Sequence, residues 1–205
     1  MGSEHAMTRM LSAGSWAVSL LLGLAALGCE PGGVGDPCTP EDEYQNNFNG
    51  FQVTEVNVES RSFQCETRVC LVNHFQGRVS CPGGQTQVDA ETAPKCAIPG
   101  TADPKTMAAA PEDQIKVQVP AQLTARQTEQ AVYCSCRCDG PDEKARYCEC
   151  PEGFQCEPLV DDLKIGASGG QLAGSYCIRQ GSKYDPVKHN ASGESCATAP
   201  DKCKL

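Results

Sequence analysis

Cysteine content is the feature that most constrains this fold, because 15 of the 205 residues are cysteines. That is about 7%, close to the level typical of disulfide scaffolds. Aromatic residues make up only 5% of the chain, so large side chains for a core are scarce. A core of this kind needs cross-links for stability. With 20 Gly and 14 Pro favouring turns, the sequence predicts a small disulfide-rich fold of mainly short β-strands and irregular loops, preceded by one signal helix at the N-terminus.

The first 28 residues have the pattern of a secretory signal peptide. A polar stretch with Arg9 precedes the apolar run 16–27, WAVSLLLGLAAL. Twelve residues are too few for a membrane-spanning helix, which needs about 20. A basic start, a short apolar run and small residues after it are typical of a cleaved leader. Met7 is an alternative start to Met1.

The leader ends at Cys29, in the sequence AALGC (25–29). This resembles the bacterial lipobox, although Ala26 stands where Leu is usual and Leu27 where a small residue is usual. The resemblance implies cleavage after Gly28, acyl chains on Cys29 and an anchor in the cell envelope, with the outer membrane as the default location. The alternative is ordinary signal cleavage with Cys29 in a disulfide. Parity favours lipid, because removing Cys29 leaves an even number of cysteines.

The mature chain divides by composition. Residues 29–37, with the Gly/Pro-rich EPGGVGDP, are interpreted as the lipidated cysteine and a flexible tether. A first cysteine-rich lobe spans 38–96, an Ala/Pro-rich linker or loop 97–113, and a second cysteine-rich lobe 114–205. The disulfide candidates are Cys38, Cys65, Cys70, Cys81, Cys96, Cys134, Cys136, Cys138, Cys148, Cys150, Cys156, Cys177, Cys196 and Cys203. The lobes hold five and nine of these, so full pairing requires at least one bond between them.

Short stretches of alternating apolar residues predict strands within 51–60, 67–75 and 115–120, where Pro120 ends the last one. The stretch 124–132 predicts two helical turns. No repeat of fixed period is visible.

Segment 131–156 carries the densest cysteine pattern. Alternation places Cys134, Cys136 and Cys138 on one face of a strand, too far apart to pair with one another. A turn at 139–147 and a second strand at Cys148–Cys150 predict a hairpin over 131–150. The stretch 148–156, CECPEGFQC, resembles the end of an epidermal-growth-factor-like module, with a shorter spacing before the last cysteine. The resemblance implies an extracellular disulfide module.

Three kinds of chemistry are weighed against this framework. Clustered thiolates could bind zinc or copper(I), but exported cysteines pair in an oxidising compartment. The motif Gly-x-Ser-x-Gly at 166–170 offers Ser168 as a nucleophile, with His74 or His189 as base, but no long helix follows it. The acidic runs 41–43 and 161–162 lack the spacing of an EF-hand and are interpreted as solvated loops.

The sequence therefore predicts a membrane-anchored cell-envelope lipoprotein with a non-catalytic, disulfide-stabilised structural or binding domain. The expected partners are the membrane, through the lipid, and a protein or glycan of the envelope. The net charge of −9 argues against nucleic acid. No cofactor and no metal ion are expected. Thiolate metal binding is the alternative function, and a secreted serine hydrolase is the less favoured one.

Overall fold

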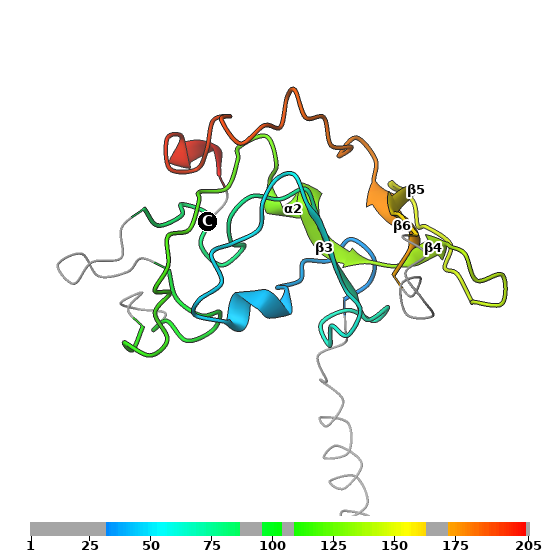
Figure 1. Cartoon of the computed structure of the whole chain (residues 1–205), viewed down its shortest axis with the longest axis horizontal. Coiled ribbons are helices and arrows are strands. Elements are labelled where there is room, and N and C mark those ends of the chain that lie inside the picture. Colours follow the sequence, from blue (N-terminus) through cyan, green and yellow to red (C-terminus); the bar gives the residue numbers. More distant parts are fainter. Residues whose placement is uncertain (1–31, 87–95, 104–108, 163–171, 204–205) are drawn as a thin grey trace, which may run out of the picture. The chain divides into compact units, whose positions relative to one another are not determined.

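The computed structural model describes residues 32–86, 96–103, 109–162 and 172–203. The predicted leader, Cys29 and Ser168 lie outside these ranges. Two three-stranded antiparallel sheets form the frame, in the orders β1-β2-β3 and β4-β6-β5 (Figure 1). The elements are η1 (Glu41–Tyr44), β1 (Val56–Glu59), β2 (Val69–Asn73), α2 (Thr128–Ala131), β3 (Val132–Ser135), β4 (Arg137–Asp139), β5 (Phe154–Val160), β6 (Gly174–Arg179) and η2 (Pro200–Lys202). The predicted class, a small disulfide-rich fold with short strands, is confirmed. No helix among the described residues is long and apolar enough to cross a membrane.

Strand β2 lies in the middle of the first sheet and is buried on both faces. Its side chains alternate, as the strand period requires: Cys70 and Val72 join one apolar cluster, and Leu71 joins another. The neighbouring strand matches this pattern, because Cys70 pairs with Cys134 and Leu71 with Tyr133. The apolar run VCLVN thus forms the central strand that its composition favours.

The second sheet shares one of these clusters with the first. Leu71 and Tyr133 come from the first sheet, and Tyr176 and Ile178 come from β6. The Tyr133 hydroxyl also accepts a hydrogen bond of 3.0 Å from the Arg179 N–H. This shared apolar cluster joins the two sheets, and residues 31–205 form one compact unit.

Seven disulfides use all fourteen predicted cysteines. The pairs are Cys38–Cys70, Cys65–Cys134, Cys81–Cys96, Cys136–Cys148, Cys138–Cys156, Cys150–Cys177 and Cys196–Cys203. The bond between the two cysteine groups, which the odd counts require, is Cys65–Cys134. Strands β2 and β3 come from opposite sides of residues 97–113, so the two groups build one sheet rather than separate lobes.

Two fully buried arginines, Arg126 and Arg78, donate hydrogen bonds to backbone carbonyls around the two sheets. The Arg126 guanidinium donates to the carbonyl oxygens of Asn73, His74 and Ser182, at 3.0 Å for His74 and 2.7 Å for Ser182. Asn73 ends β2, His74 follows it, and Ser182 comes after β6, so Arg126 ties the ends of these two strands together. Buried carbonyl oxygens without donors would be costly, and Arg126 satisfies three of them.

Arg78 likewise donates hydrogen bonds to backbone carbonyls, beside η1. It donates to the carbonyls of Glu43, Gln45 and Phe48. The Glu43 carboxylate is itself fully buried and accepts the N–H groups of Val79 and Ser80. The interpretation of 41–43 as a wholly solvated loop is therefore wrong for Glu43, which these bonds hold inside the fold.

The tether prediction is also wrong over residues 32–37. Gly35 N–H donates to the Cys134 carbonyl, and Cys134 N–H donates to the Asp36 carbonyl, each at 2.8 Å. This segment covers the outer edge of β3. Gly35 has φ +99°, and a Cβ there would lie 2.7 Å from the Phe154 ring. Glycine is therefore present here for a close contact and a left-handed backbone, not for flexibility.

The predicted hairpin over 131–150 is not formed. Strands β3 and β4 pair with β2 and β6, and residues 148–150 belong to no strand. Disulfide Cys136–Cys148 holds the returning chain in place instead.

The predicted strand at 115–120 does not form, and hydrogen bonds from Gln85 hold this segment instead. The Gln85 backbone pairs with that of Val119, and the Gln85 amide donates to the carbonyls of Ile115 and Val117 at 2.9 and 3.0 Å. A glutamine side chain thus takes the place of a neighbouring strand. The helix expected over 124–132 is shorter, and only α2 forms.

Candidate functional site

Nine of the fourteen predicted cysteines lie in three tight groups of sulfur atoms. Within each group the sulfurs lie within 4.8 Å of one another: Cys38, Cys65 and Cys134; Cys136, Cys148 and Cys177; Cys138, Cys150 and Cys156. Every one of these sulfurs belongs to a disulfide. The thiolate, not the disulfide, is the metal ligand, so these groups are arranged as packed cross-links in the oxidised protein.

The two histidines considered as bases, His74 and His189, both lie near the ring of Tyr184. His74 stacks on the Tyr184 ring at 3.9 Å, and the His189 ring lies 5.9 Å from it. Burial lowers the pKa of both imidazoles. Nδ1 of His74 bonds the Val53 carbonyl, and Nδ1 of His189 accepts the Asp185 N–H. These contacts join β2 to the chain after β6, which is a structural role.

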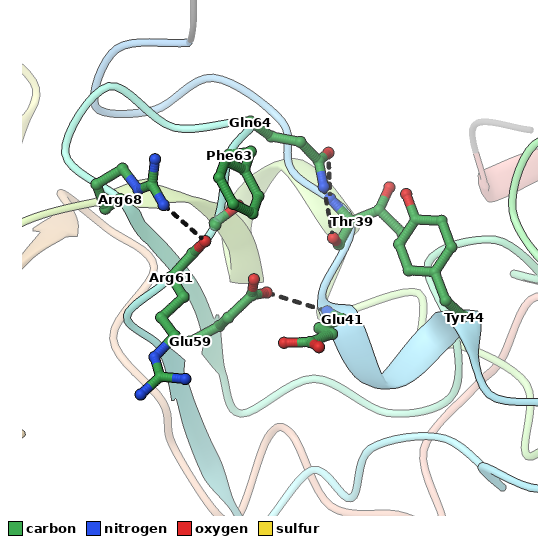
Figure 2. A pocket seen from close by; sticks show the side chains of 9 residues that line it. Thr39, Glu41, Tyr44, Glu59, Arg61, Phe63, Gln64 and Arg68 are labelled. Carbon is green, nitrogen blue, oxygen red and sulfur yellow. Dashed lines mark hydrogen bonds between the residues drawn. The ribbon is translucent and has the colours of Figure 1, made fainter.

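A pocket of about 520 Å³ lies between η1 and the chain that follows β1 (Figure 2). We call it the aromatic pocket. It is lined by Thr39, Glu41, Tyr44, Glu59, Arg61, Ser62, Phe63, Gln64 and Arg68. Its volume falls in the range of about 300–1,000 Å³ typical of ligand sites. Disulfides Cys38–Cys70 and Cys65–Cys134 hold both lining segments, because Cys38 precedes Thr39 and Cys65 follows Gln64.

The aromatic pocket contains the two exposed Phe and Tyr side chains of the described residues. All five Phe and five Tyr residues fall within the described ranges. Among them only Phe63 and Tyr44 are exposed, at 82% and 48%. The other eight are buried or half-buried. A single exposed apolar residue is ordinary, but the gathering of both in one pocket is the kind of feature that marks a binding site.

Several lining side chains are fixed by internal hydrogen bonds. The Gln64 amide donates to the Thr39 carbonyl at 2.8 Å and accepts the Thr39 N–H at 3.0 Å. The Glu59 carboxylate accepts the Glu41 N–H at 3.0 Å. Figure 2 shows these bonds joining the two walls. The pocket is therefore formed before any ligand arrives.

Arg68 completes the wall beside Phe63. Its guanidinium lies 4.2 Å from the Phe63 ring centre, a cation–π contact, and donates to the Arg61 carbonyl at 3.4 Å. Arg68 also has a left-handed backbone, with φ +66°. Its N–H bonds the Cys65 carbonyl and its carbonyl accepts the Ser62 N–H, which closes the turn that presents Phe63.

The remaining polar groups of the pocket are unengaged. Within the described part of the chain, no hydrogen bond or ion pair holds the Glu41 carboxylate, the Arg61 guanidinium or the Tyr44 hydroxyl. The Ser62 hydroxyl is buried without a partner. Partial burial raises the pKa of Glu59, and the negative charges of Glu41 and Asp42 raise it further. Residues with free donors and acceptors thus line the same pocket as the two aromatic rings.

Sequence reasoning did not find this pocket. The signal that could have found it is Phe63 itself, a large apolar residue in the otherwise polar stretch ESRSFQ (59–64) directly before a cysteine. Tyr44 gives a weaker signal within EDEYQNN (41–47). Disulfides Cys38–Cys70 and Cys65–Cys134 and the hydrogen bonds between the two walls hold these stretches together.

Comparison with family models, with curated proteins and with solved structures finds no match for this chain.

Proposed function

We propose that this protein is a bacterial cell-envelope lipoprotein, anchored through Cys29, whose non-catalytic domain binds an envelope partner in the aromatic pocket. The anchor rests on the leader and on the lipobox-like AALGC (25–29). The outer membrane is the proposed location. The epidermal-growth-factor-like ending at 148–156 is compatible with an extracellular disulfide module.

The binding role rests on one observation, the presence of both exposed aromatic side chains, Tyr44 and Phe63, in one pocket. Leaving Phe63 in water forgoes about 1.5–3 kcal/mol of burial free energy, and the half-exposed Tyr44 forgoes less. Binding a partner would recover part of it. The disulfides on both sides of the pocket reduce the cost of ordering it, which favours affinity.

The anchor is tested by intact mass of the protein purified from its own membranes. We expect a chain beginning at Cys29 that carries acyl mass and gains about 14 Da on reduction of seven disulfides. Cys29→Ser should leave the membrane fraction. A Cys29→Ser protein that stays membrane-bound would contradict the anchor.

The pocket is tested by site-specific photocrosslinking in the living cell. A photoreactive phenylalanine analogue replaces Phe63, and a matched control replaces Val187, which is 81% exposed and remote from the pocket residues in sequence. We expect a defined adduct from position 63 that position 187 does not give. Identical adducts from both positions would contradict binding in the pocket.

A further inference from the structure

We propose that the ligand of the aromatic pocket is an uncharged saccharide. This inference rests on the proposed binding function and names its ligand class. Four features of the pocket carry it: balanced charge, free planar polar groups, exposed ring faces and the position of charged groups within the lining.

The charges of the lining cancel. Glu41 and Glu59 contribute two carboxylates, and Arg61 and Arg68 contribute two guanidinium groups. A cation or an anion would meet one attractive pair and one repulsive pair, and would lose hydration on entry. The protein as a whole has a net charge of −9, which further disfavours an anionic ligand. A neutral ligand avoids these costs.

The unengaged groups have the chemistry that hydroxyls require. The Glu41 carboxylate accepts hydrogen bonds, the Arg61 guanidinium donates them in a planar fork, and the Tyr44 hydroxyl does both. Two adjacent hydroxyls on a sugar ring match a carboxylate or guanidinium in bidentate fashion, and such charge-assisted bonds are stronger than neutral ones. The buried Ser62 hydroxyl, which lacks a partner in the described structure, adds a further polar group to the lining.

The exposed rings provide the complementary apolar surface. A pyranose ring has C–H groups on its faces and hydroxyls at its edge, so it packs on an aromatic face while its edge bonds polar groups. Phe63 is 82% exposed even with Arg68 stacked at 4.2 Å. Tyr44 stands on the opposite wall, on η1 (Figure 2). The rings and the polar groups thus surround one space.

A protein partner fits this lining less well. Protein interfaces are depleted of charged residues at their centre and enriched in them at the rim. Here Glu59 is partly buried in the lining, and the two aromatic rings are the most exposed apolar members. An apolar peptide side chain entering the pocket would desolvate Glu59 and Glu41 without giving them hydrogen bonds.

The experiment measures binding of three neutral hexasaccharides, cellohexaose, maltohexaose and chitohexaose, to the full-length oxidised protein by saturation-transfer NMR and calorimetry. We expect at least one to bind at millimolar concentration or below. Phe63→Ala and Tyr44→Ala should each weaken binding about tenfold, and Val187→Ala should not change it. The Kd should change less than about twofold between low and high salt, because the ligand carries no charge to be screened.

Two charged oligomers distinguish the alternatives. Hexagalacturonic acid is the anionic probe and chitosan hexamer the cationic one. Tighter, salt-sensitive binding of either would overturn the inference, and so would neutral-sugar binding that Phe63→Ala leaves unchanged. Each variant is first checked by mass for seven disulfides, so that misfolding is recognised. Phe63→Leu is the second variant, because it keeps apolar bulk without the aromatic ring. It should bind the saccharide as weakly as Phe63→Ala.

Failure of the inference is separable from failure of the proposed function. If no neutral hexasaccharide binds while the photoreactive residue at position 63 still gives a specific adduct, the pocket binds another class of partner and only the saccharide assignment is wrong. If neither sugar binding nor a specific adduct is found, the binding function is wrong as well.

Discussion

The two sheets of this protein are stabilised by different means. In the first sheet, β2 and β3 are buried along almost their whole length, and the half-cystines Cys65, Cys70 and Cys134 are members of the apolar cluster. In the second sheet, β5 is exposed or half-buried throughout. There three disulfides join β4, β5, β6 and the loop between β4 and β5.

The sulfur atoms of the second sheet pack against one another. The Cys177 sulfur lies 3.5 Å from that of Cys136 and 3.8 Å from that of Cys148, although it is bonded to neither. The disulfides therefore form the interior on the Cys177 face of β6, while Tyr176 and Ile178 belong to the apolar cluster shared with the first sheet. The comparison teaches that disulfides lie within the apolar cluster of the first sheet but pack sulfur against sulfur in the second, so each region should be sensitive to a different kind of change.

The largest effect is expected from loss of the bond between the two cysteine groups. Replacing Cys65 and Cys134 by Ala opens a loop of 69 residues. Chain entropy alone then lowers the free energy of unfolding by about 4 kcal/mol, and the lost packing in the first cluster adds to this. Urea unfolding of the full-length protein measures the change.

The matched control removes a disulfide that closes a much shorter loop. Cys196 and Cys203 are only 7 residues apart, so their double Ala variant should lose about 2 kcal/mol. Equal losses in the two variants would show that loop length does not govern stability here, and would weaken the entropic part of the comparison.

The second prediction compares one substitution in the two regions. Phe51 is 2% exposed in the first cluster, so Phe51→Ala should cost about 4 kcal/mol of unfolding free energy. Phe154 is half-buried on β5, against Tyr133 and Arg179, so Phe154→Ala should cost about 1–2 kcal/mol. Both values come from urea unfolding, and a Phe154→Ala loss as large as that of Phe51→Ala would break the contrast between the sheets.

Sequence alone could predict the class of this fold but only part of its layout. The cysteine content predicted a disulfide scaffold, and parity predicted the bond that Cys65–Cys134 makes. The apolar run at 67–75 predicted a strand, which forms as β2 over Val69–Asn73. The hairpin failed because alternation in Cys134, Cys136 and Cys138 shows a strand's face, not which distant strand pairs with it.

The tether and the pocket were missed for a related reason. Glycine-rich composition at 30–37 does not distinguish a flexible segment from one in which Gly35 allows a close approach to Phe154. The exposure of Phe63 likewise depends on its turn, which the backbone of Arg68 closes. Both features depend on contacts between residues far apart in sequence, and a local pattern does not carry that information.

The third prediction concerns the connection between the two regions. Arg126→Met removes the donors to the carbonyls of Asn73, His74 and Ser182 while keeping apolar bulk. Leaving buried acceptors without donors should lower the free energy of unfolding by about 3 kcal/mol. Arg126→Lys should recover only part of this, because one ammonium lacks the planar fork.

Amide hydrogen exchange tests whether Arg126→Met loosens the connection between the sheets more than the rest of the fold. The N–H of Ser182 bonds the Arg179 carbonyl at the end of β6, and its exchange should accelerate in Arg126→Met more than that of Leu71 in the middle of β2. Equal acceleration at both amides would show that Arg126 stabilises the whole fold rather than the connection.

The smallest effect on the free energy of unfolding is expected from lowering the pH, which protonates His74 and His189 near the same connection. Burial lowers the folded-state pKa of His74 and of His189 below the unfolded value of about 6.5. The unfolded chain therefore binds more protons as pH falls through this value, so these histidines make the free energy of unfolding decrease below about pH 6.5. Protonation of His189 at Nδ1 would also remove the acceptor for the Asp185 N–H.

Because the carboxyl groups of Asp185 and Glu194 also have lowered pKa values and that of Glu59 a raised one, the test uses a difference. The wild type and the double variant His74→Gln, His189→Gln are unfolded in urea at pH 7.5, 6.5 and 5.5. The wild type should lose more stability than the variant over this range, since only the wild type has imidazoles to protonate at these two positions. Parallel losses would show that protonation of His74 and His189 does not change the stability of this connection.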